Sequence, residues 1–150
     1  MEKRKYFDYE LAYEGYKKAL NLFNKGGIEE IINNEEFNIS GGGLDYTGTI
    51  EQWSSNGYLP INASAYNITL YAIDKNFDTD NKENNWYISG ELDIYSYSSG
   101  EDNLYINDKK SIDDRINNLL DYSIKNNYSI EDYEKELASL EKVLEVLNNE

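Results

Sequence analysis

Carboxylates and tyrosines crowd one fifth of this chain, and they define the chemistry that it can offer. Residues 76–108 contain eight acidic side chains and one lysine, which gives the segment a formal charge of −7. Carboxylates bind Lys and Arg through ion pairs, and Tyr rings bind the same cations through their faces. We therefore expect a surface that binds a basic protein. Its residues are Asp78, Asp80, Glu83, Tyr87, Glu91, Asp93, Tyr95, Tyr97, Glu101 and Asp102. Charge runs are also typical of solvated loops, and that alternative stays open.

Catalytic chemistry has little to build on. The 150 residues contain no His and no Cys, which excludes Ser-His-Asp and Cys-His sites and thiolate metal sites. The remaining acids are mostly dispersed, so no pair is marked out as a general acid and base. A carboxylate-metal nuclease would need basic residues to hold its substrate. We expect no enzyme activity, no catalytic residue, no cofactor and no bound metal.

Two loops could bind small ions, and both fit their templates poorly. Residues 74–80 place oxygen-bearing side chains at every second position, as a calcium loop does. However, Thr79 stands where that loop needs glycine, and Asn85 stands where it needs a bidentate Glu. A polar hairpin loop explains the segment better. The glycines at 41–43 could cradle a phosphate, but Asp45 would repel it, so a flexible loop is the better interpretation.

The elements that must position these residues follow from periodicity. Apolar residues at three-four spacing predict a helix over 8–24, capped by Asp8 and ended by Gly26 and Gly27, with further helical turns up to residue 34. The pattern then changes to alternation. It predicts strands over 46–53, 66–73 and 86–97, with a short one at 104–106. The strand at 86–97 places Tyr87, Glu91, Asp93, Tyr95 and Tyr97 on a single outward face.

The end of the chain predicts two helices. Ser111 and Ser129 each resemble the first residue of a capping box. The second helix carries an apolar stripe at three-four spacing, formed by Ile130, Tyr133, Leu137, Leu140, Leu144 and Leu147. The turn at residues 126–127 is short, so an antiparallel helical hairpin is expected, with its stripe packed internally rather than in a dimer.

The expected fold class is therefore α+β. An N-terminal helix is followed by a three- to four-stranded antiparallel sheet and a C-terminal antiparallel helical hairpin, with helices on one sheet face, in a single domain over 1–150. No segment has the length or the apolar character of a signal peptide or a membrane span, so a cytoplasmic protein without membrane contact is expected. The chain would be a monomer or a homodimer.

The charge of the whole chain points to the partner. Its net charge is −15, from 29 acidic and 14 basic residues, so it should repel nucleic acid and be attracted to basic protein surfaces. Abundant Asn, Ile, Lys and Tyr suggest AT-rich coding DNA, as in low-GC bacteria and their phages.

With its acidic strand face at Glu91 and Asp93 and its acidic loops, the chain resembles the small phage-encoded inhibitors of bacterial defence, the anti-CRISPR and anti-restriction proteins. The resemblance implies a stoichiometric inhibitor in the bacterial host cell that occupies the basic channel of a nucleic-acid-binding nuclease. The alternative is an immunity-type or adaptor protein that binds one toxin or assembly partner without mimicking nucleic acid.

Overall fold

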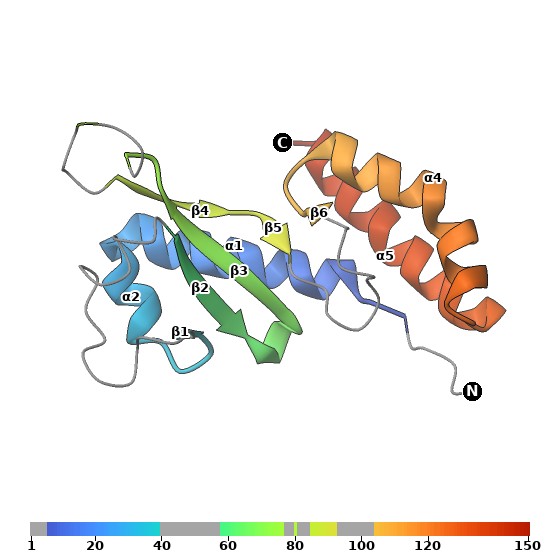
Figure 1. Ribbon diagram of the computed structural model, residues 1–150, viewed down its shortest axis with the longest axis horizontal. Helices are drawn as coiled ribbons and strands as arrows, with labels where there is room; N and C mark the ends of the chain where they lie inside the picture. The colour runs from blue at the N-terminus through green and yellow to red at the C-terminus, as the bar shows by residue number, and fades with distance from the viewer. Residues whose placement is uncertain (1–5, 40–57, 77–79, 81–84, 93–103) are drawn as a thin grey trace. The chain divides into compact units, whose positions relative to one another are not determined.

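The structure is a computed structural model, and it describes residues 6–39, 58–76, 80, 85–92 and 104–150. Figure 1 shows the order of the elements along the chain. The α+β class, the N-terminal helix, the antiparallel sheet and the C-terminal helix pair are all confirmed. The strand expected over 46–53 lies outside the described residues. No helix in the described part of the chain is long and apolar enough to cross a membrane.

The described residues group into two compact units. The sheet unit comprises Gly15–Ser89, and the helical unit comprises Met1–Glu14 together with Gly90–Glu150. Helix α1 (Tyr9–Gly26) begins in the helical unit and continues into the sheet unit. Whether the units form the single domain expected from the sequence stays a prediction.

The sheet unit contains a four-stranded antiparallel sheet in the order β1-β2-β3-β4. Its strands are β1 (Asn38–Ile39), β2 (Tyr58–Ala63), β3 (Ile68–Asp74) and β4 (Trp86–Ser89). Helix α1 lies against one face of the sheet, and α2 (Ile28–Ile32) follows it after Gly27, whose φ of 78° ends α1 as expected. The core is formed by alternating side chains of the strands, including Leu59, Ile61, Leu70, Ala72 and Ile88, all buried.

Two strands at the start of the sheet, β1 and β2, were not expected. β2 contains Pro60, which cannot donate a hydrogen bond within a sheet. In the described pairing Pro60 lies opposite Tyr71 of β3, and β1 pairs with the next two residues, Ile61 and Asn62. The strand expected from residue 66 begins at Ile68 instead. A short 3-10 helix (Ser64–Tyr66) and the left-handed Asn67, with a φ of 59°, precede it.

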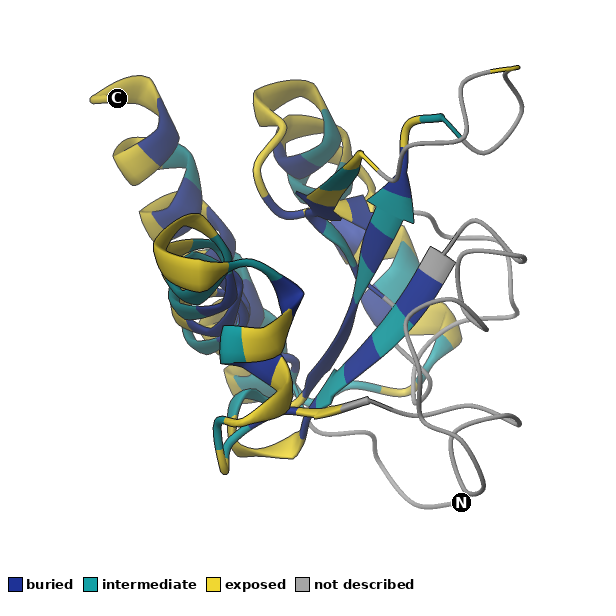
Figure 2. Ribbon diagram, turned by 90° about the vertical axis from the view of Figure 1, so that its left-hand side faces the viewer, coloured by how far each residue is buried: buried dark blue, intermediate teal, exposed yellow. Residues whose placement is uncertain are grey.

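The helical unit consists mainly of α4 (Lys109–Lys125) and α5 (Ile130–Asn148), joined by a turn at Asn126 and Asn127. A two-stranded sheet of β5 (Glu91–Leu92) and β6 (Leu104–Tyr105) belongs to the same unit. In Figure 2 buried residues run along one side of each helix and exposed residues along the other, as amphipathic helices require.

The two capping boxes expected from the sequence have different outcomes. Ser129 is the N-cap of α5, and its side chain accepts a hydrogen bond from the backbone N of Asp132, as predicted. The prediction for Ser111 is wrong, because α4 begins at Lys109 with Asp108 as its N-cap. The Ser111 hydroxyl instead accepts a hydrogen bond from the backbone N of Tyr105, which ties β6 to the first turn of α4.

The apolar stripe of the hairpin is also shifted from its expected position. Leu140 and Leu147 are buried as predicted, but Val143 and the polar residues Glu136 and Ser139 are buried beside them. Ile130, expected at the head of the stripe, is exposed. The buried face of α5 is therefore rotated toward Glu136, whose carboxylate accepts hydrogen bonds from Phe7 and Tyr128.

Candidate partner-binding surface

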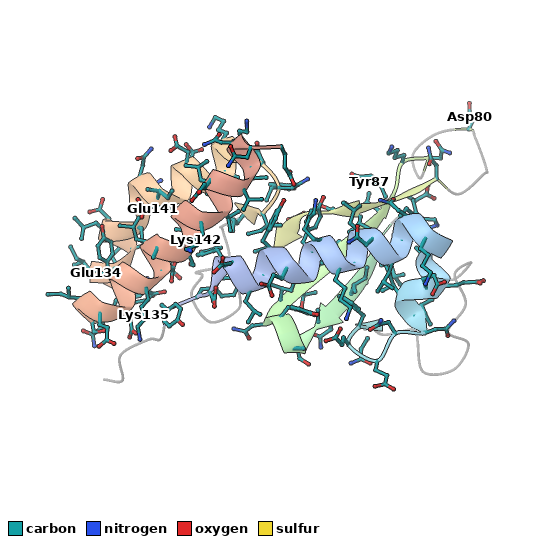
Figure 3. The ribbon with its side chains drawn as sticks, turned by 180° about the vertical axis from the view of Figure 1, so that it is seen from behind. Asp80, Tyr87, Glu134, Lys135, Glu141 and Lys142 are labelled. Carbon is teal, nitrogen blue, oxygen red and sulfur yellow. The ribbon has the colours of Figure 1, made fainter. Side chains whose placement is uncertain are left out.

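The structure describes only three of the ten residues expected to bind a partner. Asp80 is exposed, Tyr87 lies exposed on β4, and Glu91 lies half-buried on β5. Figure 3 shows Asp80 and Tyr87 from the side opposite to Figure 1. The other seven lie outside the described residues. They are Asp78, Glu83, Asp93, Tyr95, Tyr97, Glu101 and Asp102.

The prediction of one continuous strand that carries both Tyr87 and Glu91 is wrong. The expected strand over 86–97 is interrupted at Gly90, and β4 and β5 on either side of it belong to different sheets. The carbonyl of Gly90 accepts a hydrogen bond from the backbone N of Ile106 at 2.8 Å. A Cβ at this position would lie 2.2 Å from the side-chain oxygen of Asn107, so a larger residue would force the Asn107 side chain to shift. β5 pairs with β6 instead of continuing β4, while Ile88, Gly90 and Leu92 are all buried as the alternation predicts.

Tyr87 already binds a cation of its own chain. The ammonium of Lys75 lies 5.3 Å from the centroid of the Tyr87 ring, within the range of a cation–π contact. Lys75 directly follows β3, and Tyr87 is the second residue of β4, so both lie at the end of the hairpin where the two strands are connected. The ring is thus placed to receive a basic group, and a partner's cation at the same face would have to displace Lys75.

Asp74 forms hydrogen bonds that close the base of this hairpin. It is buried, and its Oδ1 accepts hydrogen bonds from the backbone N of Asn76 at 2.9 Å and of Asn85 at 3.1 Å. Backbone donors at these distances satisfy a carboxylate oxygen in the place of a cation. This geometry supports the hairpin-loop interpretation of residues 74–80, of which 77–79 lie outside the described residues.

Charge is distributed unequally between the two units. The described residues of the helical unit include 15 acidic and 6 basic side chains, a net charge of −9. Those of the sheet unit include 6 acidic and 4 basic side chains, a net charge of −2. The described negative charge is therefore concentrated in the helical unit, which also includes Glu91 and Asp108 of the acidic segment 76–108.

The outer face of α5 carries a repeating pair of opposite charges. Glu134 and Lys135 recur seven residues later as Glu141 and Lys142, and all four side chains are exposed (Figure 3). Lys135 donates to Glu131 at 3.0 Å, and this contact is the main cause of the raised pKa of Lys135. Exposed pairs of this kind contribute little to stability, so the face is free to exchange its internal pairs for those of a partner.

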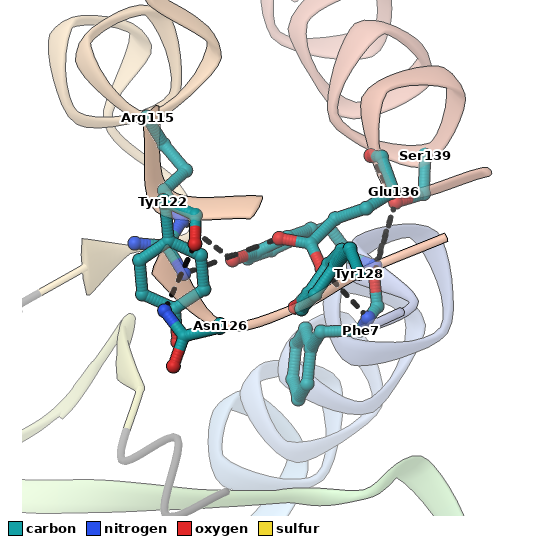
Figure 4. A network of polar contacts seen from close by, with 8 residues as sticks. Phe7, Arg115, Tyr122, Asn126, Tyr128, Glu136 and Ser139 are labelled. Carbon is teal, nitrogen blue, oxygen red and sulfur yellow. Dashed lines mark hydrogen bonds and ion pairs between the residues drawn. The ribbon is translucent and has the colours of Figure 1, made fainter. Parts of the chain in front are cut away.

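Behind this face the helical unit contains a buried polar network centred on Glu136 (Figure 4). Its Oε1 accepts two hydrogen bonds, from the backbone N of Phe7 and from the hydroxyl of Tyr128, each at 2.8 Å. Its Oε2 lies 4.0 Å from Nη2 of Arg115. Ser139, one turn further along α5, accepts a hydrogen bond from the backbone N of Tyr9. Together these contacts fix the segment before α1 to α5.

Arg115 extends the network through its other side. Its Nε donates to the hydroxyl of Tyr9 at 3.0 Å, and its guanidinium lies 4.1 Å from the centroid of the Tyr122 ring. Tyr9 is fully buried, and burial raises the pKa of its hydroxyl well above the ordinary value. The guanidinium therefore meets a neutral phenol, an aromatic face and one carboxylate.

Burial also raises the pKa of Glu136 above its ordinary value, against the opposing effects of the Phe7 N–H, the Tyr128 hydroxyl and Arg115. Such a shift is common among catalytic acids. Here the side chain has no exposed surface, so no substrate can reach it, and its role is to position the N-terminal segment. Sequence reasoning missed Glu136 and Arg115. The available signal was the place of Glu136 between Tyr133 and Leu140 on the inner face of a helix.

No family model matches this chain, and no similar protein was found among curated proteins or solved structures. Function is therefore argued from the chemistry of the described surface.

Proposed function

We propose that this chain is a non-enzymatic acidic binding protein, and that it acts as a stoichiometric inhibitor on the basic nucleic-acid-binding surface of a bacterial defence nuclease. The observation that carries the proposal is the net charge of −9 on the described residues of the helical unit. A surface made to hold phosphates is positively charged, and it attracts a carboxylate surface by the same long-range forces.

The form of the helical unit supports binding rather than catalysis. The exposed acids of α5 stand on a rigid helix, which is held to the N-terminal segment by the Glu136 network. Rigid presentation lowers the entropy that must be lost on binding, so charge on such a platform is more effective than charge on a loose chain. Glu136, the described carboxylate with a raised pKa, is fully buried, and it holds the N-terminal segment against α5.

Inhibition assays with purified CRISPR effector nucleases and restriction endonucleases test the proposal. We expect cleavage by the target nuclease to stop at about one inhibitor per enzyme. The complex of enzyme and inhibitor, followed in a binding assay without substrate, should dissociate when ionic strength is raised toward 1 M, where the Debye length falls to about 3 Å. DNA or guide RNA should compete with the inhibitor for the enzyme. A binding partner whose affinity ignores both salt and nucleic acid would contradict mimicry.

An immunity-type or adaptor function is the second candidate, and one observation favours it. The hairpin of α4 and α5 exposes large aliphatic side chains, Ile124 and Ile130 above all. Apolar contacts give an affinity that depends weakly on salt. The same titration therefore separates the two functions, since an adaptor keeps its partner at high salt and in the presence of nucleic acid.

A further inference from the structure

The most exposed large apolar side chains among the described residues all fall within residues 120–130. Leu120 is 55% exposed, Ile124 is 70% exposed and Ile130 is 78% exposed, while every other exposed large apolar residue is at 43% or less. All three belong to the last turns of α4 and the first turn of α5. We call this group the hairpin tip. Clusters of exposed apolar residues on a folded protein mark sites of interaction.

The hairpin tip is presented on a well-ordered turn. Leu120 and Ile124 are four residues apart and therefore share one face of α4. The backbone N of Tyr128 donates to the carbonyl of Ser123 at 2.9 Å, and Asn127 adopts a left-handed φ of 59°. The Ser129 cap then sets Ile130 as the first residue of α5. These contacts fix the backbone of the turn from which Ile124 and Ile130 project.

The charged residues around the hairpin tip define the partner's chemistry. Among the described residues that are close to it in the sequence, acidic side chains outnumber lysines, and one of each is already paired, because Lys135 is bonded to Glu131. The acids are Asp121, Glu131, Asp132 and Glu134, and the lysines are Lys125 and Lys135. A partner that covers the apolar residues must therefore offer an apolar surface with a basic rim. A second copy of this chain would bring the same acidic rim and a net charge of −15, so like charges would oppose it.

We infer that the hairpin tip docks into an apolar, basic-rimmed surface of a partner protein. This inference rests on the proposed function of an acidic binding protein and deepens it, because it names the part of the helical unit that anchors the complex, whether the protein acts as an inhibitor or as an adaptor. Charge would guide the approach, and burial of Leu120, Ile124 and Ile130 would slow dissociation.

Two synthetic peptides of about 18 residues serve as probes, because an amphipathic helix of that length can present one apolar and one basic face. The first peptide has Leu at three-four spacing along one face of a helix and Lys along the other, and the second replaces every Leu with Ser. Binding is measured by fluorescence anisotropy at about 150 mM salt, and its location by amide chemical-shift changes in the ¹⁵N-labelled protein. We expect the Lys/Leu peptide to bind more tightly, with the largest shifts over residues 120–131.

The deciding variant is Ile124→Ser/Ile130→Ser, and its matched control is Ile32→Ser/Val146→Ser, which removes two exposed aliphatic residues elsewhere. Circular dichroism checks that both variants fold. We expect the tip variant to bind the Lys/Leu peptide about tenfold more weakly, and the control to bind like the wild type.

Equal binding by the tip variant and the wild type, or shifts centred elsewhere, would overturn the inference while leaving the proposed function intact. If the wild type binds neither basic peptide even at low salt, the proposed function fails with it. Analytical sedimentation tests whether a second copy of this chain occupies the hairpin tip. A wild-type dimer that the tip variant loses would assign the hairpin tip to a second copy and overturn the inference.

Discussion

The sheet unit and the helical unit each bury a carboxylate, and they satisfy it by different means. Asp74 in the sheet unit accepts from the backbone of Asn76 and Asn85, both within the hairpin that it closes. Glu136 in the helical unit accepts from Phe7, which is 129 residues away in the sequence, and from Tyr128. One carboxylate stabilises a local turn, and the other holds together the two ends of the chain.

The difference extends to the surfaces of the two units. The described residues of the sheet unit are nearly neutral, while those of the helical unit have a net charge of −9. Concentrating like charges destabilises a compact state. The helical unit therefore has a greater need of long-range contacts such as that between Glu136 and Phe7, and these contacts should be the more costly ones to remove.

Replacement of the two buried carboxylates tests this contrast with the largest expected effect. Glu136→Leu removes the carboxylate beside Arg115 and the acceptor of the hydrogen bonds from the Phe7 N–H and the Tyr128 hydroxyl. We expect a loss of about 3–5 kcal/mol in the free energy of unfolding. Asp74→Ala should lose only about 1–3 kcal/mol, because the freed backbone donors lie at a hairpin end. Urea unfolding followed by circular dichroism measures both, with exposed Glu134→Gln as a near-neutral control. Equal losses for the two carboxylates would remove the distinction.

The pH dependence of stability sharpens the account of Glu136. Its folded pKa is raised by burial above the ordinary value of 4.5, so folding disfavours the ionised form. The stability that this group contributes is fully present below its unfolded pKa, and it is lost as the pH rises through the folded pKa. The wild type should therefore lose stability relative to Glu136→Gln as the pH rises from about 4 upward, by at most about 1.4 kcal/mol per pH unit. Parallel urea titrations of the two proteins measure this difference, and a constant difference across the range would exclude a raised pKa.

Gly15 offers the corresponding test for the sheet unit. A Cβ at Gly15 would lie 2.6 Å from Cβ of Tyr66, which is close to the backbone and cannot move aside easily. We expect Gly15→Ala to destabilise by about 1–2 kcal/mol, since overpacking exceeds the gain in helix propensity. Gly26→Ala is the matched control in the same helix, because its new Cβ would meet only the flexible Glu30 side chain. Both tryptophans fall within Gly15–Ser89, so tryptophan fluorescence follows the sheet unit directly.

The cap of α5 provides a smaller test within the helical unit. Ser129→Ala removes the acceptor for the backbone N of Asp132 and should cost about 1 kcal/mol. Ser129→Asp keeps an acceptor and should restore most of the stability. Thermal unfolding followed at 222 nm compares the three proteins. If Ser129→Asp were as unstable as Ser129→Ala, the loss could not be assigned to capping.

Local signals in the sequence predicted local structure well and long-range structure poorly. The end of α1 at Gly27 and the cap of α5 at Ser129 were both predicted, because each depends on residues within one helical turn. Ser111 carries the same local signal, but its hydroxyl is taken by Tyr105 and the helix starts earlier. The break at Gly90 was missed for the same kind of reason, because it depends on Ile106 and Asn107 across the small sheet.

The sequence predicted the acidic character of the candidate surface better than the positions of its residues. An acidic surface was expected, yet Tyr87 and Glu91 proved to belong to different sheets, and seven of the ten residues lie outside the described part. Glu136 and Arg115 were missed because isolated charges in a helix are usually solvated. Only the convergence of Phe7, Tyr9 and Tyr128 on the inner face of the hairpin makes their burial possible.

The smallest expected effect concerns which unit meets a basic partner. Glu134→Lys/Glu141→Lys reverses two exposed charges in the helical unit, and Glu29→Lys/Glu35→Lys makes the same change in the sheet unit. Both variants alter the net charge equally, so a probe that senses only total charge cannot tell them apart. Against the Lys/Ser peptide at low salt, we expect the first variant to bind about threefold more weakly than the second, because screening confines each charge to its own neighbourhood. Anisotropy titrations at two salt concentrations measure the ratio. A ratio of one would show that the charge asymmetry between the units has no part in binding, and a ratio below one would move the basic partner to the sheet unit.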